Sequence, residues 1–131
     1  MGGMYMDTDI NILIVEDDSL ISEMYLEALI LEGFDARSIM VSRKVPEAKI
    51  AYENNKATIE IIFFDGTLCG VSSEELIREI RVHSQVPMLC ISGDKTDKLV
   101  AAAGSNCIGI EKPAEFKQIL KAVSDLGISP H

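Results

Sequence analysis

Residues 61–70 read IIFFDGTLCG, and this stretch decides the fold. Four apolar residues end abruptly at a single carboxylate, Asp65, and the chain then turns at Gly66. A short apolar run between polar segments is typical of a strand that is covered on both faces of a sheet. We therefore predict a strand over residues 59–64 that ends at Asp65, and ask which chemistry uses a lone acid at that position.

The same pattern recurs along the chain, because apolar runs alternate with segments of helical period. The predicted strands cover residues 12–15, 34–41, 59–64, 86–91 and 107–110. The predicted helices cover residues 20–32, 46–55, a segment opened by Ser72 or Ser73, 95–103 and 114–126. Strands that are apolar throughout and separated by helices favour a parallel sheet covered on both faces. The sequence therefore predicts an α/β fold with a doubly wound five-stranded sheet.

Helix ends and buried faces can also be assigned from the sequence. Ser19 is a suitable N-cap for the helix over 20–32, and Gly33 is a suitable end. Helical spacing places one apolar face inward in this helix and in two later ones. The expected inward residues are Ile21, Met24, Tyr25, Ala28 and Leu29, then Leu76, Ile77 and Ile80, then Phe116, Ile119, Leu120 and Val123.

Length and charge limit the classes of function. The 131 residues suit one domain, which we place at 10–128, with a flexible lead-in at 1–9 and a short tail at 129–131. The net charge of −9 argues against direct binding to nucleic acid or anionic membrane. No secretory signal or membrane-length apolar run is present, and the three cysteines show no metal-ligand spacing. We expect a cytoplasmic protein with reduced thiols.

Polar side chains follow the predicted strands at the point where each ends. Glu16, Asp17 and Asp18 follow the first strand, Asp65 the third, Ser92 the fourth and Lys112 the fifth. Ligands of doubly wound sheets bind beyond the carboxyl ends of the strands. Clustered carboxylates suit Mg²⁺, and a hydroxyl with an ammonium suits a phosphoryl group. A carboxylate among them can be the nucleophile that forms an acyl phosphate.

With IVEDDSLI at residues 14–21, Asp65 and Ser92 at strand ends, and the pair Lys112-Pro113, the chain resembles the response-regulator receiver (CheY-like) domain. The resemblance covers about residues 10–126 and implies a flavodoxin-like (βα)5 fold with strand order 2-1-3-4-5. It implies that Glu16, Asp17, Asp65 and the backbone carbonyl of Thr67 bind Mg²⁺. Asp65 would be the phosphoacceptor, and Ser92 and Lys112 would contact the phosphoryl group. Asp18 would be an acidic neighbour and not a ligand.

The implied function is a phosphoacceptor in a two-component phosphorelay, and not an enzyme beyond self-phosphorylation and autodephosphorylation. The implied partners are a histidine kinase or phosphotransfer protein and a downstream effector. The alternative is a degenerate receiver that binds proteins without phosphorylation. A second alternative is a haloacid-dehalogenase-type phosphatase, whose first motif reads DxDGT. The nucleophile position of that motif is occupied here by Phe63, which argues against it.

Three positions depart from the family pattern. Gly109 stands three residues before Lys112, where the family usually carries an aromatic residue that changes orientation on phosphorylation. Cys69 stands at a usual proline, and Gly66 replaces a bulky apolar residue. The fourth helix is expected to be about one turn shorter than usual. We therefore expect an atypical partner-binding face and a signal that leaves by another route.

Overall fold

A computed structural model describes residues 9–94 and 96–131. The elements are β1 (Ile12–Val15), α1 (Ser19–Glu32), the 3-10 helix η2 (Ala36–Ser38), β2 (Ile39–Ser42), α2 (Val45–Asn55), β3 (Ile61–Asp65), β4 (Thr67–Leu68), β5 (Val71–Ser72), α3 (Glu74–Arg81), β6 (Met88–Ser92), α4 (Thr96–Ala103), β7 (Cys107–Glu111) and α5 (Phe116–Asp125).

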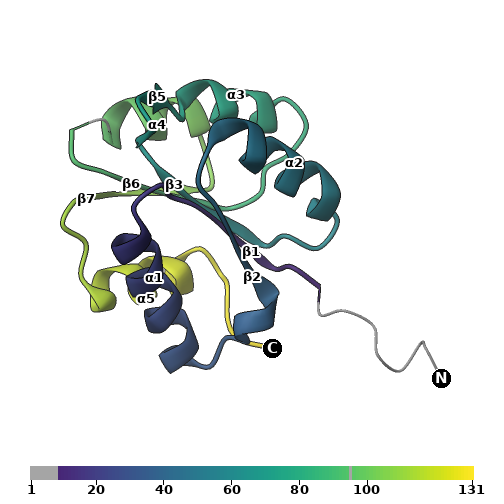
Figure 1. Cartoon of the computed structure of the whole chain (residues 1–131), viewed down its shortest axis with the longest axis vertical. Helices are drawn as coiled ribbons and strands as arrows, with labels where there is room; N and C mark the ends of the chain where they lie inside the picture. Colours follow the sequence, from purple (N-terminus) through teal and green to yellow (C-terminus); the bar gives the residue numbers. More distant parts are fainter. Residues whose placement is uncertain (1–8, 95) are drawn as a thin grey trace.

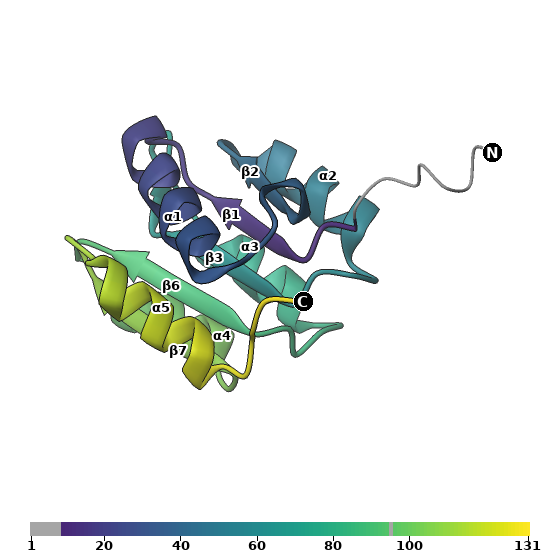
Figure 2. The ribbon, with the colours of Figure 1, turned by 90° about the horizontal axis from the view of Figure 1, so that it is seen from below.

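The main sheet has five parallel strands in the order β2-β1-β3-β6-β7. This is the predicted order 2-1-3-4-5, with β6 and β7 as the fourth and fifth strands. Helices α2, α3 and α4 cover one face and α1 and α5 cover the other (Figure 1). Figure 2 shows α1 and α5 side by side across one face of the sheet. The predicted α/β doubly wound fold is therefore confirmed.

The core lies in two layers because side chains alternate along each strand. In β3, Ile62 and Phe64 belong to the cluster under α2, α3 and α4, and Ile61 and Phe63 to the cluster under α1 and α5. All four side chains are almost fully buried. Phe63 therefore lies within the core and not at the edge of the sheet, where the phosphatase alternative would need a nucleophile.

The start of α1 differs from the prediction. Asp18, and not Ser19, is the N-cap: its carboxylate accepts hydrogen bonds from the backbone N–H groups of Leu20 and Ile21, at 2.9 and 3.2 Å. Ser19 is the first helical residue. An acid at this position also interacts favourably with the positive end of the helix dipole. The predicted end is confirmed, because Gly33 takes the left-handed conformation with φ of 113°.

Several boundaries move by a few residues. The strand predicted over 34–41 forms only at Ile39–Ser42, because Asp35 accepts a hydrogen bond from Arg37 N–H and opens the short helix η2. β3 and β6 begin two residues later than predicted and include their terminal polar residues, Asp65 and Ser92. The predicted start of the fourth helix at Lys95 lies outside the described residues, and that helix ends at Ala103 as predicted.

Most predicted inward residues are buried or packed against the core. Phe116 is an exception, because it opens α5 half-exposed, two residues later than the predicted start of that helix. There the N-cap is Glu115, which forms a reciprocal capping box with Gln118. The inward residues of α3, Leu76, Ile77 and Ile80, are confirmed as buried.

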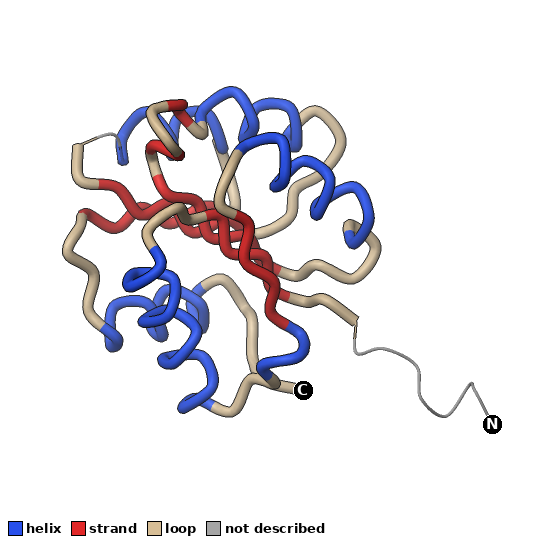
Figure 3. The backbone as a smooth tube through the Cα atoms, viewed as in Figure 1, coloured by secondary structure: helices blue, strands red, loops and turns tan. Residues whose placement is uncertain are grey.

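The segment after β3 forms a small antiparallel hairpin, β4–β5, which the sequence analysis did not predict (Figure 3). Cys69 and Gly70 occupy its turn with positive φ values of 51° and 82°. Two consecutive positive φ values are typical of a type I′ hairpin turn. The hairpin holds Thr67 opposite Ser72 and brings the Cys69 backbone toward the end of β1.

The described part of the chain has no helix that is long and apolar enough to cross a membrane. The predicted lead-in at 1–9 lies almost wholly outside the described residues. In the predicted tail, Pro130 lies beside Gly33 and the His131 imidazole is 2.7 Å from the Glu60 carboxylate.

Candidate functional site

The carboxyl ends of β1 and β3 bring three acids together. One carboxylate oxygen from each of Glu16, Asp17 and Asp65 lies within 4.8 Å of the other two. Glu16 and Asp65 are buried and Asp17 is half-buried. The neighbouring strands β1 and β3 pair in parallel, so residues that are far apart in sequence meet at one edge of the sheet.

Lys112 reaches this cluster from the end of β7. Its Nζ is 2.8 Å from Asp65 Oδ1 and 3.1 Å from Glu16 Oε1. Burial would lower the pKa of the lysine, but the hydrogen bond to Asp65 and the charges of Glu16 and Asp65 outweigh it and raise that pKa. Lys112 therefore stays charged and supplies one positive charge to three acids.

Glu16 is the most deeply buried of the three carboxylates. Its side chain is only 1% exposed. Burial, followed by the hydrogen bond and the charge of Asp65, raises the pKa of Glu16 to about 8, against the lowering effect of Lys112. Crowded carboxylates disfavour one another's charged form. In the absence of a cation, this carboxyl therefore holds its proton to a higher pH than an ordinary glutamate does.

Asp17 is held by the β4–β5 hairpin. Its Oδ2 accepts a hydrogen bond of 2.8 Å from the backbone N–H of Cys69. This bond is the main cause that lowers the pKa of Asp17, in spite of its partial burial. Cys69 therefore contributes its backbone to the site, while its thiol is exposed. The Asp18 side chain caps helix α1, and the place of Asp18 outside the ligand set stays a prediction.

Ser92 lies at the end of β6, next to β3, and is 3% exposed. Its carbonyl accepts hydrogen bonds from the Lys112 N–H at 2.9 Å and from the Thr96 hydroxyl at 3.2 Å. Thr67 is the first residue of β4, two positions after Asp65. The structure thus brings Glu16, Asp17, Asp65 and Lys112 into direct contact range, with Ser92 on the adjacent strand end. The roles of Ser92 and of the Thr67 carbonyl stay predictions.

Two nearby residues escaped the sequence analysis as parts of this region. The buried Ser73 hydroxyl donates a short hydrogen bond to the Asp65 carbonyl, and so fixes the backbone at the end of β3. The sequence predicted Ser72 or Ser73 as the cap of this helix: Ser73 is the N-cap residue, and the Ser72 hydroxyl accepts a hydrogen bond of 3.2 Å from the Glu74 N–H. Tyr25 lines a cavity of about 330 Å³ beside Lys112 and Pro113. Burial, then the charges of Glu16, Asp65 and Asp18, raise the pKa of Tyr25.

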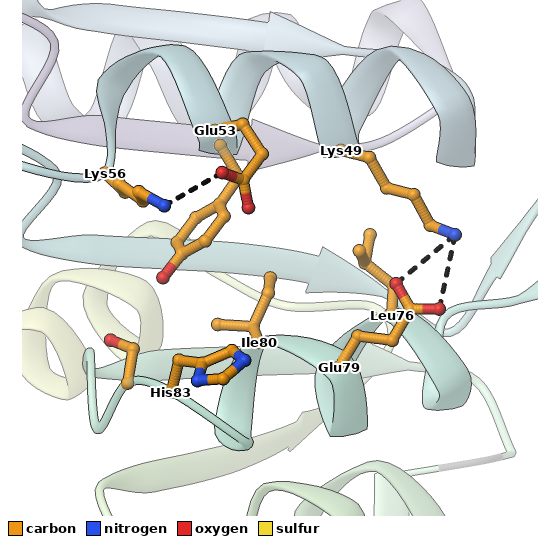
Figure 4. A pocket seen from close by; sticks show the side chains of 9 residues that line it. Lys49, Glu53, Lys56, Leu76, Glu79, Ile80 and His83 are labelled. Atoms are coloured by element: carbon orange, nitrogen blue, oxygen red, sulfur yellow. Dashed lines mark hydrogen bonds and ion pairs between the residues drawn. The ribbon is translucent and has the colours of Figure 1, made fainter.

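A second cavity, of about 410 Å³, lies between α2 and α3 and away from the carboxylates (Figure 4). Tyr52, Leu76 and Ile80 contribute apolar surface, and Lys49 pairs with Glu79 at 3.2 Å on its rim. No member of the acidic cluster lines this cavity, so its size does not connect it with the chemistry at the strand ends.

The acidic cluster fits a hard divalent cation. Three carboxylates face one lysine, which leaves an excess of negative charge when all are ionised. The raised pKa of Glu16, which is caused first by burial, includes a contribution from the neighbouring charge of Asp65. Oxygen donors of this kind are the ligands that Mg²⁺ prefers, with water completing its shell.

The comparisons agree with this fold. The regulatory protein VirG of Rhizobium radiobacter is 25% identical over 116 residues, which are 86% of this chain and 42% of that protein. The chain thus spans less than half of the length of this relative. The response regulator receiver domain protein (CheY-like) of Methanospirillum hungatei matches with a TM-score of 0.76, at 21% identity over 92% of this chain and 95% of that one.

A third match is the CheX-CheY-BeF3-Mg²⁺ complex of Borrelia burgdorferi, with a TM-score of 0.77 at 21% identity, over 92% of this chain and 90% of that chain. No family model matches the chain. The structural matches establish the fold. The chain has the fold of the response-regulator receiver (CheY-like) domain.

Proposed function

We propose that this receiver domain accepts a phosphoryl group on Asp65, in a Mg²⁺-dependent reaction, from a histidine kinase or a phosphotransfer protein. The observation that carries the proposal is the contact of Asp65 with both Lys112, at 2.8 Å, and the carboxylates of Glu16 and Asp17. This arrangement supports the proposal, because the buried Asp65 carboxylate has both a lysine and two further acids as neighbours.

The residues have separate tasks in this proposal. Glu16, Asp17 and Asp65, with the Thr67 carbonyl, hold Mg²⁺. When bound, the ion neutralises the excess negative charge and reduces the repulsion between Asp65 and an incoming phosphoryl group. Lys112 balances the charge that remains, from a position it already occupies beside Asp65. The Ser92 hydroxyl donates a hydrogen bond to a phosphoryl oxygen.

The transfer itself is a displacement at phosphorus. An oxygen of the Asp65 carboxylate forms the new P–O bond, and the P–N bond to the donor imidazole breaks. The imidazole leaves with the bonding electron pair and takes up a proton, which yields an acyl phosphate on Asp65. Water later cleaves the acyl phosphate, which is the expected autodephosphorylation. The Ser73 hydroxyl keeps the Asp65 backbone fixed during both steps.

The proposed output is a conformational change that begins at Ser92 and is recognised by a downstream effector protein or domain in the cytoplasm. A ligand shifts such an equilibrium only as far as it binds the two states differently. The relative VirG is named a regulatory protein, and the chain matches 42% of its length. The net charge of −9 favours protein partners over nucleic acid or membrane for this domain.

The test is intact mass after incubation with Mg²⁺ and acetyl phosphate. One added phosphoryl group is expected in the wild type, and none with EDTA or in Asp65→Asn. The matched control is Asp18→Asn, because asparagine also caps helices well and Asp18 lies beside the site without belonging to it. Label that persists on Asp65→Asn would contradict the assignment of the acceptor.

The alternative is a receiver fold that binds a partner without phosphorylation. It is favoured by Gly109, which removes the aromatic residue through which the family usually signals. In that case the wild type would bind Mg²⁺ but gain no mass from acetyl phosphate. The same experiment therefore separates the two functions.

A further inference from the structure

Two thiols lie against each other at the base of the last two strands. The Sγ atoms of Cys90 in β6 and Cys107 in β7 are 3.4 Å apart. They are not bonded, since both cysteines are free and a disulfide bond measures about 2.05 Å. Cys69, the third cysteine, is exposed and lies at the opposite end of the sheet, in the β4–β5 hairpin.

The two thiols differ in environment. Cys90 is 0% exposed, while Cys107 is partly exposed on an edge strand. The hydrogen bond from Cys90, helped by the positive charge of Arg81, lowers the pKa of Cys107 in spite of its burial. The same hydrogen bond, with burial, raises the pKa of Cys90. Of the two thiols, Cys107 is therefore the one that loses its proton more readily, and the thiolate is the reactive form of cysteine.

Arg81 supplies a fixed positive charge beside the pair. Its guanidinium donates hydrogen bonds to main-chain carbonyls only, including those of Ala103 and Val86 at 2.7 Å each. Further bonds go to the carbonyls of Ser84, Ser105 and Asn106. No carboxylate pairs with Arg81 in the part of the chain that the structure describes, so its charge stays available to Cys107.

We propose that Cys107 and Cys90 form an oxidisable pair that a hydroperoxide closes to a disulfide. The Cys107 thiolate attacks one peroxide oxygen, the O–O bond breaks, and the released oxyanion takes a proton to leave as an alcohol or water. Cys107 is then a sulfenic acid. The Cys90 sulfur attacks it, the S–O bond breaks, and water leaves with the Cys90 proton. In total, two thiols lose two electrons and two protons, and the hydroperoxide is reduced.

Closing the bond requires the sulfurs to move together and the two strands to adjust, because the two cysteines are not directly paired. The sulfurs must approach by about 1.3 Å, from 3.4 Å to the bonded distance. The pair is diagonal, since Cys90 lies opposite Gly109 and Cys107 lies opposite Met88. The closed loop contains the whole of α4, because this helix lies between the two cysteines. Oxidation would therefore tie together both ends of the segment that carries α4. This inference does not depend on phosphorylation of Asp65.

The test treats the folded, reduced protein with hydrogen peroxide and maps disulfides by proteolysis and mass spectrometry without reduction. The expected product is one Cys90–Cys107 bond in most molecules, with Cys69 outside it. The variant Cys69→Ser should give the same bond, since it removes only the exposed thiol. The variant Cys90→Ala should stop at the sulfenic acid of Cys107, which dimedone traps, and Cys107→Ala should leave Cys90 unmodified.

A second measurement keeps the proposal testable if the alanine variants fold poorly. The Cys69→Ser protein, whose core is unchanged, is oxidised both folded and in urea. Faster closure in the folded state is expected, because only the fold places the sulfurs side by side and Arg81 beside Cys107. Equal rates in both states, or a folded wild type that oxidises at Cys69 while the pair stays reduced, would overturn the proposal.

Discussion

Replacing Gly109 with alanine should push α4 away from β7. A Cβ atom at this position would lie 2.4 Å from Thr96 Cγ2 and 2.8 Å from Val100 Cγ2. Carbon atoms in contact prefer about 3.5–4.0 Å, so α4 must shift by roughly 1 Å to admit one methyl group. Both neighbours are β-branched, which limits their rotation, and the movement therefore falls on the helix.

The size of the effect follows from two opposing contributions. Forcing an additional methyl group into a packed contact costs about 1–3 kcal/mol. Gly109 lies in a strand, outside the set of glycines with positive φ, so alanine can adopt its backbone conformation. The smaller entropy of the unfolded chain then returns about 0.4–1 kcal/mol. We expect Gly109→Ala to lower the free energy of unfolding by about 1–2 kcal/mol, which corresponds to roughly 4–8 °C in Tm.

The matched second variant is Thr96→Ser. It removes the methyl group that makes the shortest contact and keeps the hydroxyl that donates to the Ser92 carbonyl. Urea denaturation of the wild type, both single variants and the double variant gives the coupling energy. We expect Thr96→Ser to restore about half of the loss caused by Gly109→Ala. A Gly109→Ala protein as stable as the wild type, or additive effects of the two substitutions, would refute the close packing of α4 on Gly109.

Three other predictions concern single side chains. Asp18→Ala should lower the free energy of unfolding by about 1 kcal/mol, because α1 loses its cap. In the same urea titration, Ser19→Ala should change the free energy of unfolding by less than about 0.5 kcal/mol. Arg81→Met should lower the free energy of unfolding by about 1–3 kcal/mol, because it removes the hydrogen bonds to the carbonyls before β6 and β7. The control is Arg78→Met on the same helix, which loses only an exposed ion pair and should lower the free energy of unfolding by at most about 0.5 kcal/mol. The pKa of Glu16 in the folded state is about 8, above its ordinary value of 4.5, so the folded state binds more protons than the unfolded state between these pH values. The stability of the metal-free protein should therefore fall by a few kcal/mol as the pH rises from about 5 to about 8. Thermal unfolding in EDTA across this range should show the fall in the wild type and a flatter profile in Glu16→Gln; a profile that is equally steep in both would contradict the assignment.

The sequence was sufficient for the sheet and for the residues at its edge, because both depend on local signals. The apolar run of β3 and the acid that ends it predict a buried strand with Asp65 at the binding edge, and the structure places Asp65 there. Boundaries were less predictable where side chains compete with the backbone. Asp35 opens a turn inside a stretch that otherwise suits a strand, and Asp18 takes the cap that Ser19 could have provided.

Contacts between distant segments left no local signal. Cys69 supplies a backbone N–H to Asp17 from 52 positions away, and nothing in the letters of the hairpin indicates that bond. The pairing of Cys90 with Cys107 is of the same kind, since it depends on the register of β6 against β7 and not on a spacing motif. Such contacts are set by tertiary packing, which a pattern within one segment does not encode.

Gly109 shows how a departure visible in the sequence acquires a physical meaning only in the structure. In the sequence it is the loss of an aromatic side chain; in the structure it is the place where α4 rests on β7. Thr96 connects this place with the candidate site, because its hydroxyl binds the Ser92 carbonyl while its methyl group lies over Gly109. A displacement of the Ser92 backbone would therefore act directly on the first turn of α4, without an aromatic ring between them. Thr96→Ser therefore keeps the hydrogen bond to the Ser92 carbonyl and loses only the methyl contact with Gly109. Thr96→Ala loses the hydrogen bond to the Ser92 carbonyl as well as that contact.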